Sequence, residues 1–268
     1  MSILQELADY ARVRVEKKKG EISLYKMKEM ACNLPKGSFE FEQVLKKPGL
    51  SFICECKKAS PSKGLIAEEF PYLSIAQEYE EAGADCISVL TEPRWFLGQD
   101  AYLKEITDHI SIPCIRKDFT VDEYMIYEAK VLGASAVLLI CSILTEEELR
   151  YYLDICDELG MTALVEAHDE EEVKMALRVQ ARVIGVNNRN LKDFTVDTEN
   201  SRRMRRLIPS DVIYVSESGI KDASDIRQIY EIGADAVLIG ETLMRESDKK
   251  KKLGELKSGI PEDIYEEE

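Results

Sequence analysis

The chain alternates short apolar runs with longer amphipathic stretches. Eight of the apolar runs have the length and residue types of β-strands, and each is followed by a segment long enough for a helix. The predicted strands lie at 51–57, 85–91, 112–117, 135–141, 162–166, 182–187, 212–217 and 235–239. Regular alternation of eight strands with helices is typical of an α/β fold closed as a (β/α)8 TIM barrel, which needs about 250 residues.

Two local patterns support the barrel. EEAGADCISVL (80–90), KVLGASAVLLI (130–140) and EIGADAVLIG (231–240) repeat one sequence of helix end, glycine and strand. The glycine is expected to end a helix in the left-handed conformation before a buried parallel strand begins. A common helix-to-strand turn is the alternative interpretation, and it leaves the eight alternations in place. Two pairs also have the spacing of a capping box at a helix start: Thr120 with Glu123, and Thr145 with Glu148.

The first 50 residues precede the predicted barrel. They contain two stretches with a helical pattern, at 2–19 and 21–32, followed by a loop-like segment, NLPKGSFEF. A segment of this size buries too little apolar surface to fold alone. We therefore expect one domain over 1–268, with an N-terminal helical extension at 1–50, the barrel at 51–258 and a solvated acidic tail, PEDIYEEE.

Composition and charge exclude several classes of protein. No apolar stretch approaches the roughly 18 residues of a membrane span, and the charged N-terminus lacks the apolar core of a signal peptide, so a cytoplasmic location is expected. The net charge of −15 argues against nucleic acid and anionic membranes as partners. A small anionic substrate stays compatible with it, because a pocket can be basic within an acidic protein.

Cysteine and histidine usage gives no sign of a metal centre. Most of the seven cysteines lie in apolar runs, as expected of reduced core thiols. Cys54 and Cys56 share one strand face, and Cys-x-Cys is an alternative metal or redox site, but no second cysteine pair or nearby histidine completes it. The only histidines are His109 and His168.

Several predicted strands end in a charged or polar side chain: Glu55, Lys57, Lys117, Glu166, Asn187 and Arg189. An unpaired charge inside a strand costs several kcal/mol, whereas the carboxyl ends of barrel strands meet at one rim where active sites lie. Alternation places Glu55 and Lys57 toward the barrel mouth and the two neighbouring cysteines toward the helices. Lysines and glutamates brought together there can act as general acids and bases, and the lysines can bind a carboxylate. A buried structural ion pair is the alternative.

A phosphate site is predicted where strands seven and eight end, at Ser218-Gly219 and Gly240-Glu241. Glu241 has the wrong charge for this role, so its side chain is expected to turn away and leave its amide. Ser60, in the polar loop KKASPSKG, is a further candidate. The alternatives are ordinary turns and a solvated loop.

Two more features near the mouth have a structural and a functional interpretation. Trp95, Phe96 and Phe119 are either barrel-top core or, beside carboxylate-binding lysines, a slot for an aromatic ring. His168, two residues after Glu166, is either a rim base or, more simply, a loop or cap residue.

The segments SFICECKKASPSKG, SVLTEPRWFLG, IRKDF, LVEAHD, IGVNNRNL, SESGI and LIGETLM together resemble the indole-3-glycerol phosphate synthase family, in order from about residue 48 to 244. The resemblance implies a (β/α)8 barrel that acts without metal or organic cofactor. The substrate would be 1-(2-carboxyphenylamino)-1-deoxyribulose 5-phosphate, which undergoes ring closure and loses CO2 and water. Association with other enzymes of the tryptophan pathway is a further possibility. Cys54, Cys56 and Trp95 depart from the usual residues, and Trp95 is placed to alter the lid over the ring.

The resemblance also implies roles for particular residues. Lys117 would be the general acid that protonates the ribulose carbonyl as the ring carbon attacks. Lys57 would hold the substrate carboxylate and assist dehydration, and Glu166 would stabilise the cationic anilino system and move protons. Orientation of the sugar hydroxyls and of these charged groups would come from Glu55, Asn187, Arg189, Glu217 and Ser218. Phosphate would be held by Ser60, Gly219, Gly240 and the Glu241 amide, and the ring by Phe96, Phe119 and Leu138.

Other classes of protein stay open. A sugar-phosphate isomerase and a Schiff-base aldolase that uses Lys117 or Lys57 are also phosphate-binding barrels. A non-catalytic barrel kept for binding belongs to a different class, although a decayed enzyme is expected to have lost some catalytic residues.

Overall fold

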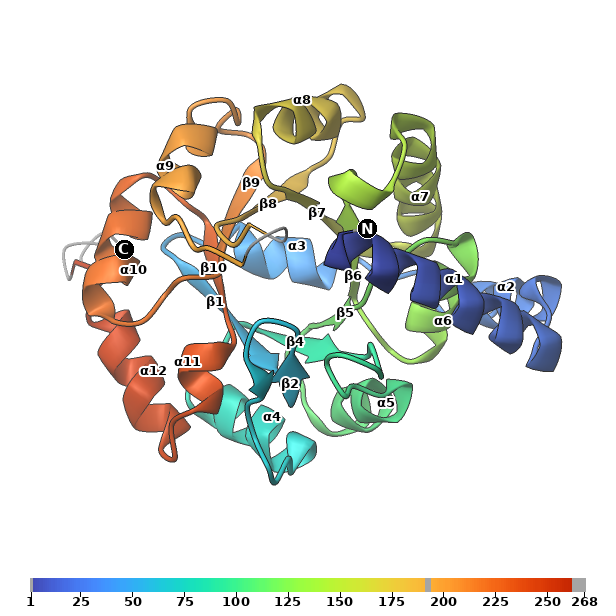
Figure 1. Cartoon of the computed structure of the whole chain (residues 1–268), viewed down its shortest axis with the longest axis horizontal. Coiled ribbons are helices and arrows are strands. Elements are labelled where there is room, and N and C mark those ends of the chain that lie inside the picture. Colours follow the sequence, from blue (N-terminus) through green and yellow to red (C-terminus); the bar gives the residue numbers. More distant parts are fainter. Residues whose placement is uncertain (1, 191–193, 262–268) are drawn as a thin grey trace.

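Eight parallel strands close into a barrel in the computed structural model, which describes residues 2–190 and 194–261 (Figure 1). Each strand pairs with the next barrel strand along the chain, and β1 pairs with the last. The strands are β1 Ser51–Cys56, β4 Cys86–Leu90, β5 Cys114–Lys117, β6 Ala136–Ile140, β7 Thr162–Ala167, β8 Val183–Asn187, β9 Ile213–Glu217 and β10 Ala236–Ile239. The predicted fold class and the eight predicted strands are confirmed, with ends that differ by one or two residues. The predicted acidic tail lies almost entirely outside the described residues.

Helices surround the barrel and cover the outer face of the strands (Figure 1). They are α4 Tyr72–Glu81, α5 Asp100–His109, α6 Glu123–Val131, α7 Glu146–Leu159, α8 Glu170–Arg178, α9 Glu199–Arg205, α10 Ala223–Glu231, α11 Glu241–Met244 and α12 Lys249–Lys257, with a 3-10 turn, η1, at Cys141–Ile143. Strands covered on both faces need apolar residues at successive positions, which is why they appear in the sequence as continuous apolar runs. A short antiparallel pair, β2 Ala59–Ser60 and β3 Gly64–Leu65, folds the loop after β1.

The predicted helix ends and starts have different outcomes. The repeated glycines, Gly83, Gly133 and Gly233, all have positive φ directly after α4, α6 and α10, as predicted. The capping box of Thr145 and Glu148 is confirmed at the start of α7. The box predicted for Thr120 and Glu123 is wrong, because α6 begins at Glu123 and its N-cap is Asp122. An aspartate adjacent to the helix caps it as well as a threonine does, and this leaves Thr120 in the buried connection after β5.

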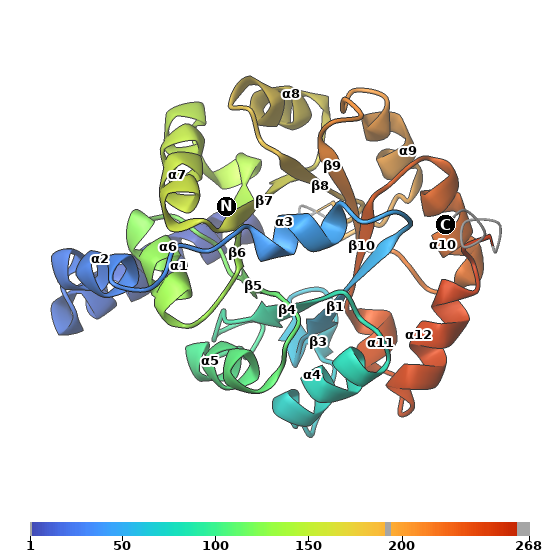
Figure 2. The ribbon, with the colours of Figure 1, turned by 180° about the vertical axis from the view of Figure 1, so that it is seen from behind.

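The N-terminal extension forms three helices. The two predicted ones are present as α1 Ile3–Glu21 and α2 Leu24–Cys32, but the predicted loop contains a third, α3 Glu40–Leu45. Its apolar residues recur at helical spacing, at Phe41, Val44 and Leu45, over too few turns to stand out in the sequence. The backbone N–H of Glu42 donates to Thr162 Oγ1 at 3.1 Å, at the amino end of β7. Figure 1 shows α1 in front of the barrel, and Figure 2, seen from behind, shows α3 across the opposite end.

Cys54 and Cys56 are fully buried on the outer face of β1, as the strand alternation predicted. Burial raises the pKa of the Cys56 thiol well above its usual value, so it stays protonated and unreactive. Across the described ranges, His, Cys, Asp and Glu side chains form no group of three that is arranged to hold a metal ion. Over the same ranges, no helix is both long enough and apolar enough to cross a lipid bilayer.

Candidate active site

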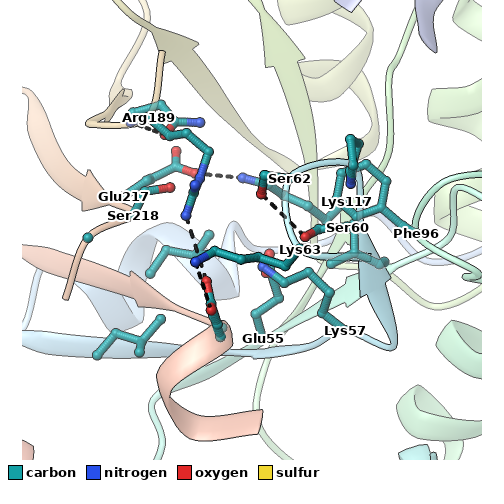
Figure 3. Close-up of a pocket in the computed structure, with 18 of the residues that line it drawn as sticks. Glu55, Lys57, Ser60, Ser62, Lys63, Phe96, Lys117, Arg189, Glu217 and Ser218 are labelled. Carbon is teal, nitrogen blue, oxygen red and sulfur yellow. Dashed lines mark hydrogen bonds and ion pairs between the residues drawn. The ribbon is translucent and has the colours of Figure 1, made fainter. Parts of the chain in front are cut away.

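A cavity of about 670 Å³ opens at the carboxyl ends of the barrel strands (Figure 3). Each of the eight strands contributes at least one lining residue, and helix α1 adds Ile3 and Leu7. Every residue to which the family resemblance gave a role lines this cavity, from Glu55 on β1 to Glu241 at the start of α11, whereas the candidates Trp95 and His168 do not. The fold therefore brings together residues that are spread over more than 180 positions of the chain, while their individual roles stay predictions.

Lys117 occupies the centre of a buried charge cluster. Its Nζ lies 2.6 Å from Glu217 Oε2 and 3.3 Å from Glu166 Oε2. Across β4, at the end of β1, Lys57 Nζ lies 2.6 Å from Glu55 Oε1. Two lysines thus face three glutamates, so the cluster carries one more negative than positive charge when all five are ionised.

The pKa values of the cluster follow from this balance. Burial opposes the charge of Lys117, but the carboxylates of Glu217, Glu166 and Glu55 outweigh it and raise the Lys117 pKa. Burial also raises the pKa of Glu217 to about 7, against the attraction of Lys117. Burial favours neutral Glu55, yet Lys57 and Lys117 hold the Glu55 pKa below its usual value. Lys117 is therefore held protonated beside a carboxyl group whose pKa lies near neutral pH, and perturbed groups of this kind in a cavity are typical of a functional site.

Glycine is required at both predicted phosphate positions. A Cβ on Gly240 would lie 2.4 Å from Glu55 Oε1 and 2.9 Å from Lys57 Nζ. Gly219 has a φ of +87°, and a Cβ there would meet Val196 and Thr198. Any other residue would therefore displace the Glu55–Lys57 pair at position 240 or strain the backbone at position 219.

The Glu241 side chain does not turn away from the cavity, so that prediction is wrong. Its carboxylate lies 3.4 Å from Lys63 Nζ, 3.8 Å from an Arg189 nitrogen and 3.1 Å from Arg245 Nε. Three cations converge at this end of the cavity, and their attraction holds the Glu241 carboxylate there. The same cations make the end of the cavity suitable for an anion.

An apolar wall forms another side of the cavity. Phe96 and Phe119 have ring centroids 6.0 Å apart, and Leu138 lines the cavity with them. Trp95 does not line the cavity; its ring packs edge-on against Tyr10 of α1 at 5.6 Å. The loop after β4 thus supplies Phe96 to the cavity, while the preceding residue, Trp95, packs against α1.

Comparison with known proteins agrees with this geometry. A sequence model of the family described as "Indole-3-glycerol phosphate synthase" matches residues 4–256. The chain belongs to the indole-3-glycerol phosphate synthase family. It is 55% identical over 256 residues to the indole-3-glycerol phosphate synthase of Ruminiclostridium cellulolyticum, covering 95% of this chain and 98% of the relative. The corresponding protein of Lachnoclostridium phytofermentans is 48% identical over 268 residues, covering 96% and 99%. The family predicted from the sequence is confirmed.

More distant solved structures share the fold alone. The 3-hexulose-6-phosphate synthase of Salmonella typhimurium superposes with a TM-score of 0.63 at 12% identity, covering 78% of this chain and 98% of that one. The thiamine phosphate pyrophosphorylase of Pyrococcus furiosus gives 0.60 at 15% identity, covering 84% and 99%.

Within this indole-3-glycerol phosphate synthase family member, several cavity residues escaped the sequence analysis. Lys63 belongs to the loop KKASPSKG, which drew attention only to Ser60. Arg245 lies four residues after Glu241, one helical turn away, and this spacing in the sequence could have predicted their ion pair. Ile3 and Leu7 have the same four-residue spacing on α1, but nothing in the sequence shows that α1 reaches the mouth.

Of the two alternatives for His168, the structure supports the loop position after β7, and a role as a base stays a prediction. Its backbone N–H donates to Glu172 Oε2 at 2.8 Å, which ties the end of β7 to the first turn of α8. Its Nε2 also lies 3.3 Å from Glu166 Oε1, so the imidazole reaches the charge cluster from outside the cavity. This second contact was not predicted.

Proposed function

We propose that the chain converts 1-(2-carboxyphenylamino)-1-deoxyribulose 5-phosphate into indole-3-glycerol phosphate, CO2 and water by general acid–base catalysis. The observation that carries the proposal is Lys117, held between Glu166 and Glu217 at the centre of a cavity with a cationic end and an aromatic wall. A substrate with a phosphate at one end and a carboxylated aromatic ring at the other matches this layout.

Substrate orientation follows from the two ends of the cavity. The phosphate would lie near Ser60, Gly219 and Gly240, where the backbone comes close and Lys63 supplies charge. The aromatic ring would lie against Phe96, Phe119 and Leu138. Lys57 would then pair with the ring carboxylate, and the sugar carbonyl would lie near Lys117.

The first step would form a bond between the carboxylated ring carbon and the sugar carbonyl carbon. The carbonyl electron pair moves to oxygen, which takes the proton of Lys117. The ring and anilino nitrogen become cationic, and Glu166 stabilises that charge electrostatically. The bond to the carboxylate then breaks, and its electron pair restores the aromatic ring as CO2 leaves.

Dehydration would complete the reaction. The new hydroxyl leaves as water after it takes a proton from Lys57, and Glu166 removes a proton from the neighbouring carbon so that the double bond of the indole forms. Two protons are delivered and one is taken up, so one proton is consumed overall, as release of CO2 from a carboxylate requires. Acid–base groups suffice for each step.

The test is to give the purified, metal-stripped protein this substrate and follow indole fluorescence. A rising signal is expected. A flat trace from folded protein that binds the substrate would indicate a non-catalytic barrel that only binds. If the folded protein does not bind the substrate, the assigned substrate is wrong. Covalent trapping by borohydride in the presence of substrate would point to Schiff-base chemistry instead.

Glu166→Gln supplies a matched variant, because it keeps the size of the side chain and removes its charge. We expect a strong loss of turnover with a smaller effect on substrate binding. A cytoplasmic location and an association with other enzymes of the tryptophan pathway stay predictions.

A further inference from the structure

A histidine lies between the active-site carboxylate of Glu166 and a second carboxylate at the outer edge of the barrel. His168 Nε2 is 3.3 Å from Glu166 Oε1, and His168 Nδ1 is 3.1 Å from Glu172 Oε2. The side chain is mostly buried. Within the described part of the chain its Nε2 makes no hydrogen bond, so the approach to Glu166 is a contact at ion-pair distance. Both nitrogens of the ring therefore face carboxylate oxygens.

We propose that His168 is a positioning residue that stays protonated between these two carboxylates and thereby holds Glu166 ionised and oriented for catalysis. The proposal rests on the proposed function, in which Glu166 stabilises positive charge and takes up a proton. His168 lies outside the cavity and would act on the reaction through Glu166.

The hydrogen-bonding capacity of imidazole carries the argument. A neutral imidazole has one N–H donor and one nitrogen lone pair, whereas the imidazolium ion has two donors. Between two carboxylates, a neutral ring turns its lone pair toward one of them, which is repulsive. Burial opposes protonation, but the hydrogen bond to Glu172 and the charges of Glu166 and Glu172 outweigh it and raise the pKa of His168.

Groups from the surrounding elements fix the ring in place. Ser142 Oγ, from η1, lies 3.3 Å from Nδ1 and also donates to Glu172. Asn200 Nδ2, from α9, donates to the His168 carbonyl at 3.1 Å. The remaining charged groups on this side are Glu217, whose carboxylate also raises the His168 pKa, and Asp169, which caps α8.

Glu166 is consequently held between two cations. Lys117 approaches Oε2 and His168 approaches Oε1, both at 3.3 Å. The imidazolium offsets the excess negative charge of the cluster and leaves Lys117 free to give up its proton without leaving Glu166 unpaired. Loss of that cation would raise the proton affinity of Glu166, so a larger fraction of Glu166 would be protonated at low pH. The acidic side of the pH–kcat profile would then move to higher pH.

The experiment measures kcat and KM between pH 5 and 9 for the wild type, His168→Asn, Glu172→Gln and His109→Asn. For His168→Asn we expect kcat near neutral pH to fall about tenfold, the acid limb to rise by about one pH unit, and KM to change less than kcat. Glu172→Gln should give a smaller shift of the same sign. His109→Asn is the matched control, because His109 is exposed and its Nδ1 contacts the Glu105 carbonyl of its own helix, away from the cavity.

Proton NMR of the wild type tests the charge state directly, since the chain contains two histidines. The His168 signal should titrate at higher pH than that of His109. A His168 midpoint at or below that of His109 overturns the proposal even if the variants fail to fold, and so does an unshifted kcat profile in folded His168→Asn. A wild type that does not turn over the substrate would contradict the proposed function, while the NMR titration would still decide the state of His168.

Discussion

Two ion networks lie on opposite faces of the same strand, β5, and they differ in how fully their charges are paired. Arg116 faces the helices; its guanidinium donates to Thr91 Oγ1 at 3.1 Å, to the Met125 carbonyl at 3.0 Å and to Asp100 Oδ1 at 2.7 Å. Lys117, the next residue, faces the cavity, where a buried oxygen of Glu217, Oε1, has no hydrogen-bond partner among the residues that the structure describes.

This difference in pairing marks the network around Arg116 as structural and the network around Lys117 as functional. Around Arg116 the charges balance, because three cations face three carboxylates: Arg116, Arg14 and Lys18 with Asp100, Asp118 and Glu128. Within the described residues Arg14 Nε and Glu128 Oε2 make no hydrogen bond, but each belongs to a group held in an ion pair. Around Lys117 the acids outnumber the bases, one acid has its pKa raised to about 7, and the cavity lies open beside them. Incomplete pairing of buried charge is costly, and it persists where chemistry uses it.

Lys117→Ala should have the largest effect on activity. Loss of the general acid is expected to lower kcat by about 10²–10⁴-fold. The fold should survive, because Glu217 can take up a proton and water can enter the space through the cavity. Indole fluorescence gives the rate, and circular dichroism tests the fold. Retention of most of the activity would refute the acid assignment, whereas unfolding would support a structural ion pair.

Arg116→Met should give the converse result. Removing a fully buried cation leaves Asp100 and Glu128 without it, at a cost of about 3–5 kcal/mol in unfolding free energy. The kcat of the folded fraction should stay close to that of the wild type. Urea unfolding measures the loss, and Arg227→Met, which removes an exposed pair with Glu231, should cost about 0–1 kcal/mol. Equal stability of Arg116→Met and Arg227→Met would end the distinction between the two networks.

The strand ends of the functional network could be predicted from the sequence. Lys57, Lys117 and Glu166 each follow an apolar run of strand length, and closure of a parallel barrel brings all such ends to one rim. Here local pattern and overall topology point to the same place. The fold and much of the candidate site followed from that agreement.

The remaining features depend on contacts that no local pattern records. The residues by themselves did not single out Glu217, because in SESGI it precedes Ser-Gly and looks like part of a turn; only the family resemblance named it. The position of the Glu241 carboxylate depends on Lys63 and Arg189, which come from loops far apart in the chain. The approach of His168 to Glu166 depends on which way a ring turns after the strand ends.

Arg14→Met should connect the two networks. Arg14, on α1, makes two bonds to Asp118, at 2.6 and 3.0 Å, and Asp118 directly follows Lys117. We expect a loss of about 1–3 kcal/mol in unfolding free energy, and also a several-fold rise in KM because α1 carries Ile3 and Leu7 into the cavity. Arg12→Met, which removes an exposed pair with Asp9, is the control. An unchanged KM would mean that the outer network supports the strand alone.

Titration of Glu217 should give the smallest effect, a change of slope. Its pKa is raised to about 7 in the folded protein, above the usual glutamate value near 4.5 that applies when the chain is unfolded. Its contribution to stability is therefore complete below about pH 4.5 and is lost as the pH rises through 7, at up to about 1.4 kcal/mol per pH unit. Unfolding free energies measured between pH 5 and 8 for the wild type and Glu217→Gln isolate this term, because the other charges are common to both. The wild type should lose stability relative to the variant over that range. A constant difference between the two would show that Glu217 is ionised throughout, and that the network around Lys117 is as fully paired as the one around Arg116.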